Sequence, residues 1–226
     1  MAGDLPLALL DTKPGERLYL QMSGGLDSSY LAWRLLGLGY RLLVWHCSFR
    51  TAQGRWPHED AAYTNVIAWL RQQPGFAERL DELPQGLYSA GGAIDGWRLD
   101  YTFLWPEAGW HLRAIDHMGK HLPGRQDIRY IVVSDHQESR NIDDEPHTLA
   151  YETLNRNAGW PRFRERIGRL RPMSQYNRVQ IIGDMPEELI RLCWWCRTPR
   201  DGQPCHRCAT CRVVDPALDA NGIVLN

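Results

Sequence analysis

Near its N-terminus the chain passes from a strand through a glycine-containing loop into a helix, and then into a second strand. Residues 17–22 alternate between polar and apolar side chains and stop at a glycine pair, which is the pattern of a strand entering a loop. From Ser28 onward apolar residues recur three and four positions apart, which predicts a short amphipathic helix ended by Gly37 and Gly39. The apolar face of this helix consists of Leu31, Leu35 and Leu38. Residues 40–46 are again strand-like, and this order of elements is typical of a parallel α/β sheet.

The rest of the chain continues the alternation of helices and strands. Residues 58–72 and 109–122 have helical periodicity, and residues 127–134 form the most apolar strand-like run. Residues 75–107 are interrupted by Gly and Pro, which predicts short elements joined by turns, and a short helix is expected after Pro186. The buried face of the 58–72 helix should consist of Ala62, Val66, Trp69 and Leu70. We therefore expect an α/β fold with a parallel-sheet, Rossmann-like core.

Composition and charge exclude several classes of protein. The chain has 226 residues, of which 43% are hydrophobic, enough for a buried core. Its formal net charge of −1 removes the broad positive field on which non-specific nucleic-acid binding depends, so stable nucleic-acid binding is not expected. No run of about 18 apolar residues is present, so we expect no membrane association and a cytoplasmic location.

Two polar segments permit a functional and a purely structural interpretation. Residues 135–147 follow the predicted 127–134 strand, where loops of open α/β sheets line ligand sites, but a solvated connection is equally expected. Residues 162–178 carry six Arg and one acid. An exposed basic helix face is the favoured interpretation of this segment, and contact with phosphate or RNA is the alternative.

The loop between the first strand and the first helix has the sequence SGGLDSS, which is typical of an anion-binding loop. Its two glycines allow positive φ and close approach of an anion, and the N–H groups at the start of the helix point toward that anion. It is not a Walker loop, because no Lys follows. The alternative is that Asp27 and Ser28 only cap the helix. The candidate anion-binding residues are Ser23, Gly24, Gly25, Leu26, Asp27, Ser28 and Ser29.

Five of the six cysteines fall between Cys193 and Cys211. In a reducing compartment such a cluster indicates a metal site rather than disulfides, and four thiolates can close a tetrahedral zinc site. The spacing leaves two ligand sets open, either Cys193, Cys196, Cys208 and Cys211 or Cys196, Cys205, Cys208 and Cys211. An iron–sulfur cluster is the rival, but Asp215 stands where the ferredoxin pattern needs a further cysteine before proline.

The SGGLDSS loop resembles the SGG-x-D-S signature of the PP-loop ATP pyrophosphatases, which cleave ATP to AMP and pyrophosphate. The resemblance implies a Rossmann-like fold of the adenine nucleotide alpha hydrolase type. It also implies that residues 23–29 bind ATP together with Mg²⁺ and that Asp27 and Ser28 act in catalysis. By the same resemblance the adenine lies near residues 46–49.

A PP-loop combined with C-x8-C-x2-C-x2-C near the C-terminus resembles the 7-cyano-7-deazaguanine synthases of the queuosine and deazaguanine pathways. The ligands that this resemblance implies for a structural zinc ion are Cys196, Cys205, Cys208 and Cys211. It implies an ATP-dependent ligase that uses ammonia to convert 7-carboxy-7-deazaguanine to its nitrile, and a homodimer. The chain would then divide into a nucleotide-binding α/β domain, residues 1–185, and a helical and zinc-binding segment, residues 186–226.

Three other functions stay open. Residues 48–50 and 139–143 differ from the family pattern near the substrate, which favours a divergent enzyme that adenylates a related deazapurine carboxylate and transfers it to another amine. The basic segment and the spare thiols of Cys47 and Cys193 suit a PP-loop tRNA-modifying enzyme that transfers sulfur. A zinc-stabilised binding module that has lost catalysis is the third.

Overall fold

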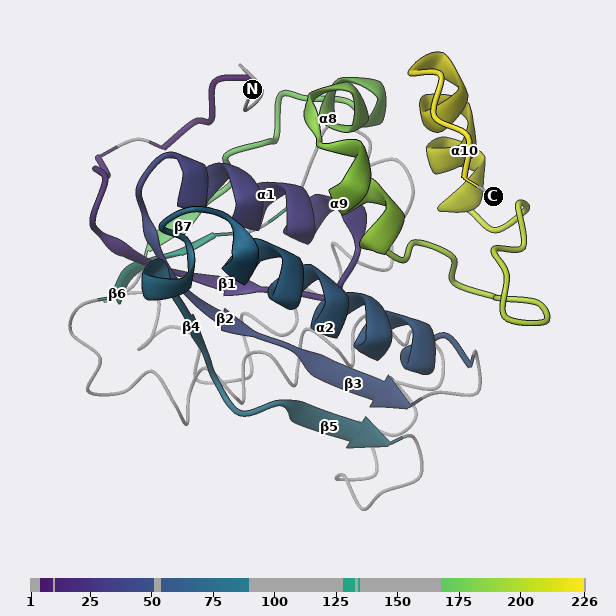
Figure 1. The fold of residues 1–226 in the computed structure, drawn as a ribbon, viewed down its shortest axis with the longest axis horizontal. Coiled ribbons are helices and arrows are strands. Elements are labelled where there is room, and N and C mark those ends of the chain that lie inside the picture. The colour runs from purple at the N-terminus through teal and green to yellow at the C-terminus, as the bar shows by residue number, and fades with distance from the viewer. Residues whose placement is uncertain are drawn as a thin grey trace.

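The protein folds around a parallel β-sheet (Figure 1). The computed structural model describes residues 5–9, 11–50, 54–89, 128–132, 134 and 168–225. The strands are β1 (Arg17–Gln21), β2 (Arg41–Trp45), β3 (Cys47–Arg50), β4 (Leu80–Glu82), β5 (Gly86–Ser89), β6 (Ile128–Val132) and β7 (Gly168–Leu170). The helices are α1 (Leu26–Gly37), α2 (Trp56–Gln72), α8 (Arg178–Asp184), α9 (Glu187–Leu192) and α10 (Cys211–Ala220), with a 3₁₀ turn at Ala77–Arg79.

The main sheet has the strand order β4-β2-β1-β6-β7, and all of its neighbouring strands are parallel. The central strand β1 pairs with β2 on one side and β6 on the other. Its residues Leu18, Tyr19 and Leu20 are buried, as expected of a strand covered on both faces. A second parallel pair, β3 and β5, follows directly after β2 and β4. The predicted Rossmann-like α/β fold is confirmed.

The strand order reverses at β1. The chain leaves β1 through α1 to reach β2, whereas β6, later in the chain, lies on the opposite side of β1. In open α/β sheets, ligands bind beyond the carboxyl ends of the strands at such a point of reversal. The SGGLDSS loop follows β1 directly, so the topology places it where this class of fold binds ligands.

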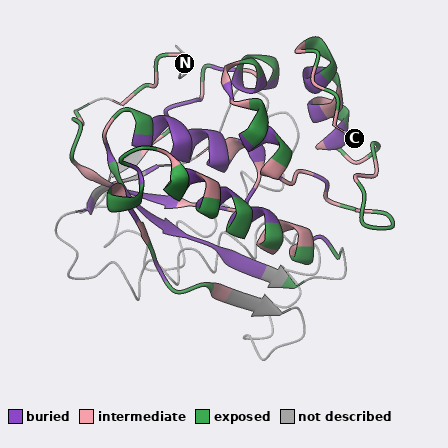
Figure 2. Cartoon of the chain, viewed as in Figure 1, coloured by how far each residue is buried: buried purple, intermediate pink, exposed green. Residues whose placement is uncertain are grey.

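Helices α1, α2, α8 and α9 lie on one side of the sheet (Figure 1). Helix α1 is buried over most of its length because the sheet lies below it and other helices contact it, whereas α2 turns an exposed face outward (Figure 2). Helix α10 packs against α8. Within the described ranges, no helix is long and apolar enough to cross a membrane.

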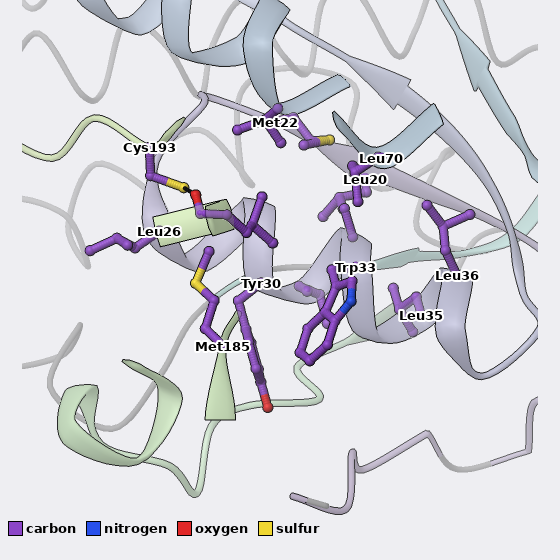
Figure 3. Packing of buried hydrophobic residues seen from close by; sticks show 14 of the residues in the cluster. Leu20, Met22, Leu26, Tyr30, Trp33, Leu35, Leu36, Leu70, Met185 and Cys193 are labelled. Atoms are coloured by element: carbon purple, nitrogen blue, oxygen red, sulfur yellow. Dashed lines mark hydrogen bonds between the residues drawn. The ribbon is translucent and has the colours of Figure 1, made fainter. Parts of the chain in front are cut away.

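One apolar cluster extends from the sheet to the C-terminal segment. Leu20 of β1 and Tyr30 of α1 belong to it together with Met185 and Cys193 (Figure 3). Val214 of α10 is buried in the same cluster. Residues on both sides of position 185 therefore share this core, and the division into two domains stays a prediction.

Most predicted elements within the described ranges are present. Strands occupy most of 17–22, 40–46 and 127–134, and α2 covers 58–72. The prediction was wrong for Leu38, which is 42% exposed because α1 has already ended.

Two further predicted segments have other outcomes. Residues 168–177 do not form the expected basic helix, because they contain β7 and a turn before α8 begins at Arg178. The predicted helix at 109–122 and the loop at 135–147 lie outside the described residues.

A buried ion pair ties α8 to α1. Arg34 of α1 pairs with Asp184 at the end of α8, and both side chains are at most 10% exposed. The Tyr30 hydroxyl donates to Asp184 at 2.7 Å, and Arg34 also donates to the Leu5 carbonyl at 2.8 Å. Burial, together with the hydrogen bond to Asp184, raises the pKa of Tyr30. The network holds α8 and the N-terminal segment against α1.

Replacing Asp184 with Ala should lower the free energy of unfolding by about 3–5 kcal/mol, because Arg34 would be left buried without its partner. Urea unfolding measures the change. The matched control is Glu187→Ala, which removes an exposed pair with Arg191 and should cost no more than about 0.5 kcal/mol. Equal losses in the two variants would contradict the prediction.

Candidate functional site

The loop after β1 turns at Gly24, where φ is +76°. A Cβ at this position would lie 2.5 Å from the backbone nitrogen of Tyr63 and 2.8 Å from the carbonyl oxygen of Glu59, both in α2. Gly25 differs, since its φ is −82° and a Cβ there would approach Ser23 Oγ to 3.2 Å. The predicted positive φ therefore occurs at Gly24 and not at Gly25, and α2 leaves room only for glycine at position 24.

Serine side chains close the loop on itself. The Ser28 hydroxyl accepts from the Ser23 N–H at 3.3 Å and donates to the Gly25 carbonyl at 3.4 Å. The Gly25 N–H donates to Ser23 Oγ at 3.3 Å. Helix α1 has Gly25 as its N-cap, without a side-chain cap, so the interpretation of Asp27 and Ser28 as capping residues was wrong. The N–H groups of the first turn have no acceptor within the helix and form the positive end of the helix dipole.

Asp27, in the first turn of α1, pairs with Arg178 at the start of α8. Both carboxylate oxygens accept from the guanidinium, with Oδ2 at 3.1 Å from Nη2. The Arg178 side chain is 5% exposed, so a buried cation lies beside the loop. This contradicts the expectation of an exposed basic face at this residue of the 162–178 segment. Bidentate, charge-assisted hydrogen bonds of this kind fix the Asp27 carboxylate in position.

The segment after α9 lies directly against the loop. The Trp194 N–H donates to the Gly24 carbonyl at 3.0 Å. The Trp194 ring stacks on His58 of α2 with 4.2 Å between ring centroids, and its indole N–H donates to the Cys196 carbonyl at 2.8 Å. Trp194 therefore joins the loop, α2 and the start of the cysteine cluster.

A second network ties the loop to α2 through His46. Its Nδ1 donates to the Met22 carbonyl at 2.8 Å, since a carbonyl can only accept, and its Nε2 lies 2.8 Å from Asp60 Oδ1. The Ser48 hydroxyl donates to Asp60 Oδ2 at 2.7 Å. The imidazole, which is 1% exposed, also stacks on Tyr63. These bonds fix the carboxyl end of β2 relative to the residue that precedes the loop.

The structure brings together the second of the two cysteine sets. The sulfur atoms within 4.8 Å of one another are those of Cys196, Cys205, Cys208 and Cys211. Backbone N–H groups donate to three of these sulfurs at 3.2–3.4 Å. Cys193 lies apart in the core, where its thiol donates to the Leu189 carbonyl at 3.2 Å and burial raises its pKa to about 12.

The four-thiol group fits a single tetrahedral ion. Zinc binds thiolate at about 2.3 Å, which sets neighbouring sulfurs about 3.8 Å apart in a tetrahedron. The observed limit of 4.8 Å is compatible with this geometry. In a four-iron cluster each cysteine binds a different iron, which spreads the sulfurs farther apart. The spacing of the four sulfurs is therefore compatible with a single tetrahedral ion.

The sequence identified the loop and the cysteines but missed two residues that contact the loop. Arg178 contacts Asp27, and its only signal in the sequence was its place in a basic segment after Pro172. Trp194 gave no signal, because a tryptophan between two cysteines does not indicate which surface it contacts. The placement of adenine near residues 46–49 stays a prediction.

Comparisons with known proteins support the fold. The U34-tRNA thiolase NcsA from Methanococcus maripaludis, solved with its 4Fe–4S cluster, is similar with a TM-score of 0.54 and 10% identity over 96% of this chain and 71% of that one. The NMN synthetase of Francisella tularensis gives a TM-score of 0.47 and 13% identity over 94% of this chain and 80% of that one. No protein-family model and no curated protein matches the sequence. The likeness shows a shared fold.

Gly24→Ala should lower the free energy of unfolding by about 2–5 kcal/mol, because it adds strain at positive φ to a clash with the backbone of α2. Gly15→Ala is the control, since Gly15 has φ of +91° and open space around it, and should cost only about 1–2 kcal/mol. Chemical denaturation compares the two. Similar losses of unfolding free energy in the two variants would show that the close contact with α2 adds nothing to the cost of Gly24→Ala.

Acid should weaken the His46–Asp60 network. Although burial raises the pKa of Asp60, hydrogen bonds from His46 and Ser48 outweigh it and hold the pKa below its ordinary value. The ionised carboxylate therefore stabilises the fold above the unfolded pKa of about 3.9, and this contribution is lost as pH falls toward the lower folded pKa. The stability difference between the wild type and Asp60→Asn should shrink as pH falls from 6 to 3, and a constant difference would contradict the prediction.

Proposed function

We propose that this chain is a PP-loop ATP pyrophosphatase that activates a carboxylate by adenylation. The observation that carries the proposal is the position of the SGGLDSS loop, beyond β1 at the reversal of strand order, with the first turn of α1 directed into it. A loop in this position, closed by its own serines, supplies N–H groups and a helix dipole to a pyrophosphate.

The residues around the loop suit cleavage between the α- and β-phosphates. The substrate carboxylate oxygen would attack the α-phosphorus, and pyrophosphate would leave while the loop N–H groups hold it. Arg178 places a buried positive charge beside the loop, where negative charge collects on the leaving group. Its bond to Asp27 keeps that carboxylate aligned at the first turn of α1.

The four-cysteine group would hold a structural zinc ion. Four thiolates fill the tetrahedron and leave no open position for water or substrate, so the ion would stabilise the C-terminal segment rather than act on the reaction. Because this segment contacts Gly24 through Trp194, its fold supports the loop.

For the substrate we propose 7-carboxy-7-deazaguanine, with ammonia as the nitrogen donor. The support is the combination of the loop with the C-x8-C-x2-C-x2-C spacing, whose four sulfurs the structure brings together. Ammonia would displace AMP from the acyl adenylate to give an amide. A second ATP would then adenylate the amide oxygen, and AMP would leave with that oxygen as two protons are lost, which gives the nitrile. A variant of this proposal is a divergent enzyme that adenylates a related deazapurine carboxylate and transfers it to another amine, which residues 48–50 favour.

A tRNA thiolase is the second candidate, favoured by the fold likeness to such an enzyme. Metal analysis separates the two. Iron with acid-labile sulfide would favour the thiolase, whereas one zinc per chain would favour the nitrile synthase. The spacing of the four sulfurs is compatible with zinc.

Incubation of the protein with ATP, Mg²⁺, ammonium and 7-carboxy-7-deazaguanine should release AMP and pyrophosphate and yield the nitrile, as measured by chromatography and mass spectrometry. Replacing ammonium with other amines tests the acceptor. AMP formation without a modified base would contradict the substrate assignment, and release of ADP in place of AMP would contradict the reaction class.

A further inference from the structure

Trp194 connects the phosphate loop to the cysteine cluster. Its backbone N–H donates to the Gly24 carbonyl, and its indole N–H donates to Cys196, the first cysteine of the cluster. Its ring is held in place by the stack on His58. The backbone of Trp194 is therefore hydrogen-bonded to the loop, and its side chain is hydrogen-bonded to the segment that contains the cysteines.

The loop has little freedom to move independently of this residue. On one side, the α2 backbone at Tyr63 lies so close to Gly24 that a Cβ would not fit. On another, the Trp194 carbonyl would lie 3.4 Å from a Cβ at Gly25. A displacement of Trp194 must therefore shift the loop or break the hydrogen bond to Gly24.

The cysteine cluster determines where this segment can lie. Cys196 is separated from Cys205 by a loop that, within the described structure, bends back on itself through paired hydrogen bonds between Arg200 and Gln203. Cys211 begins α10, which packs on α8, the helix that carries Arg178. An ion bound by the thiolates would fix Cys196 relative to α10 more firmly than the weak amide–sulfur bonds from Cys205 to Cys196 and from Cys211 to Cys208 do.

We propose that Trp194 is a positioning residue that couples the cysteine site to the phosphate loop, so that bound zinc and bound nucleotide raise each other's affinity. This inference rests on the proposed function, because it assumes that the loop binds a nucleotide and the cysteines a metal. Thermodynamic linkage requires the effect to be reciprocal, and couplings of this kind are typically about five-fold to 150-fold.

The test measures binding rather than turnover. Calorimetry gives the affinity of Mg²⁺ and α,β-methylene ATP, which is not cleaved between its α- and β-phosphates, for the zinc-loaded and the zinc-free chain. Competition with a chromogenic chelator gives the zinc affinity with and without the nucleotide. We expect zinc to tighten nucleotide binding at least about five-fold and the nucleotide to tighten zinc binding by the same factor.

A pair of tryptophan variants tests the hydrogen bond from the Trp194 indole to Cys196. Trp194→Phe keeps an aromatic ring for the stack but removes the N–H that donates to Cys196. Trp195→Phe is the matched control, because its indole nitrogen is buried and has no hydrogen-bond partner among the described residues. We expect the coupling factor to fall toward one in Trp194→Phe and to stay at the wild-type value in Trp195→Phe. A wild-type factor in Trp194→Phe would overturn the proposal.

The outcomes also separate the coupling from the function on which it rests. Nucleotide bound equally well with and without zinc would overturn the coupling alone, whereas no nucleotide binding in either form would overturn the proposed function as well. If the zinc-free chain unfolds, the variants are compared in their zinc-loaded forms. Weaker nucleotide binding by Trp194→Phe than by Trp195→Phe then supports the proposal, and equal affinities overturn it.

Discussion

The close approach of α2 to Gly24 is the constraint on which the candidate site depends. Backbone atoms of α2 occupy the space where any other residue would place its Cβ, so the loop can turn only at a glycine with positive φ. This turn carries the chain from β1 into α1 and places the N–H groups of the first turn of α1 at the carboxyl edge of the sheet. It also leaves the Gly24 carbonyl facing Trp194.

Around this turn, three separate parts of the chain meet. His46, at the end of β2, fixes the residue that precedes the loop, and Arg178, at the start of α8, fixes Asp27 after it. Trp194 fixes Gly24 itself. Each of these partners is buried or half-buried, which makes its hydrogen bonds stronger than at the surface and makes their loss costly.

The cysteine cluster belongs structurally to the same region. Its spacing in sequence left two ligand sets possible, and burial of Cys193 in the apolar core removes that thiol from the group. The cause is the position of α9, which packs on α1 and α2 and draws the residue after it into the core. The remaining four sulfurs gather at the start of α10.

The sequence by itself determined the local features of this protein. Alternation and helical spacing predicted β1, α1, β2 and α2, and the glycine pair and cysteine spacing predicted the loop and a metal site, because these patterns depend on neighbouring residues. It could not show that Arg178 is buried and paired with Asp27, or that Trp194 contacts Gly24. The partners in each of these contacts lie about 150 residues or more apart in the sequence. Only the tertiary structure decided those contacts, since they depend on how α8 and α9 pack against α1 and α2.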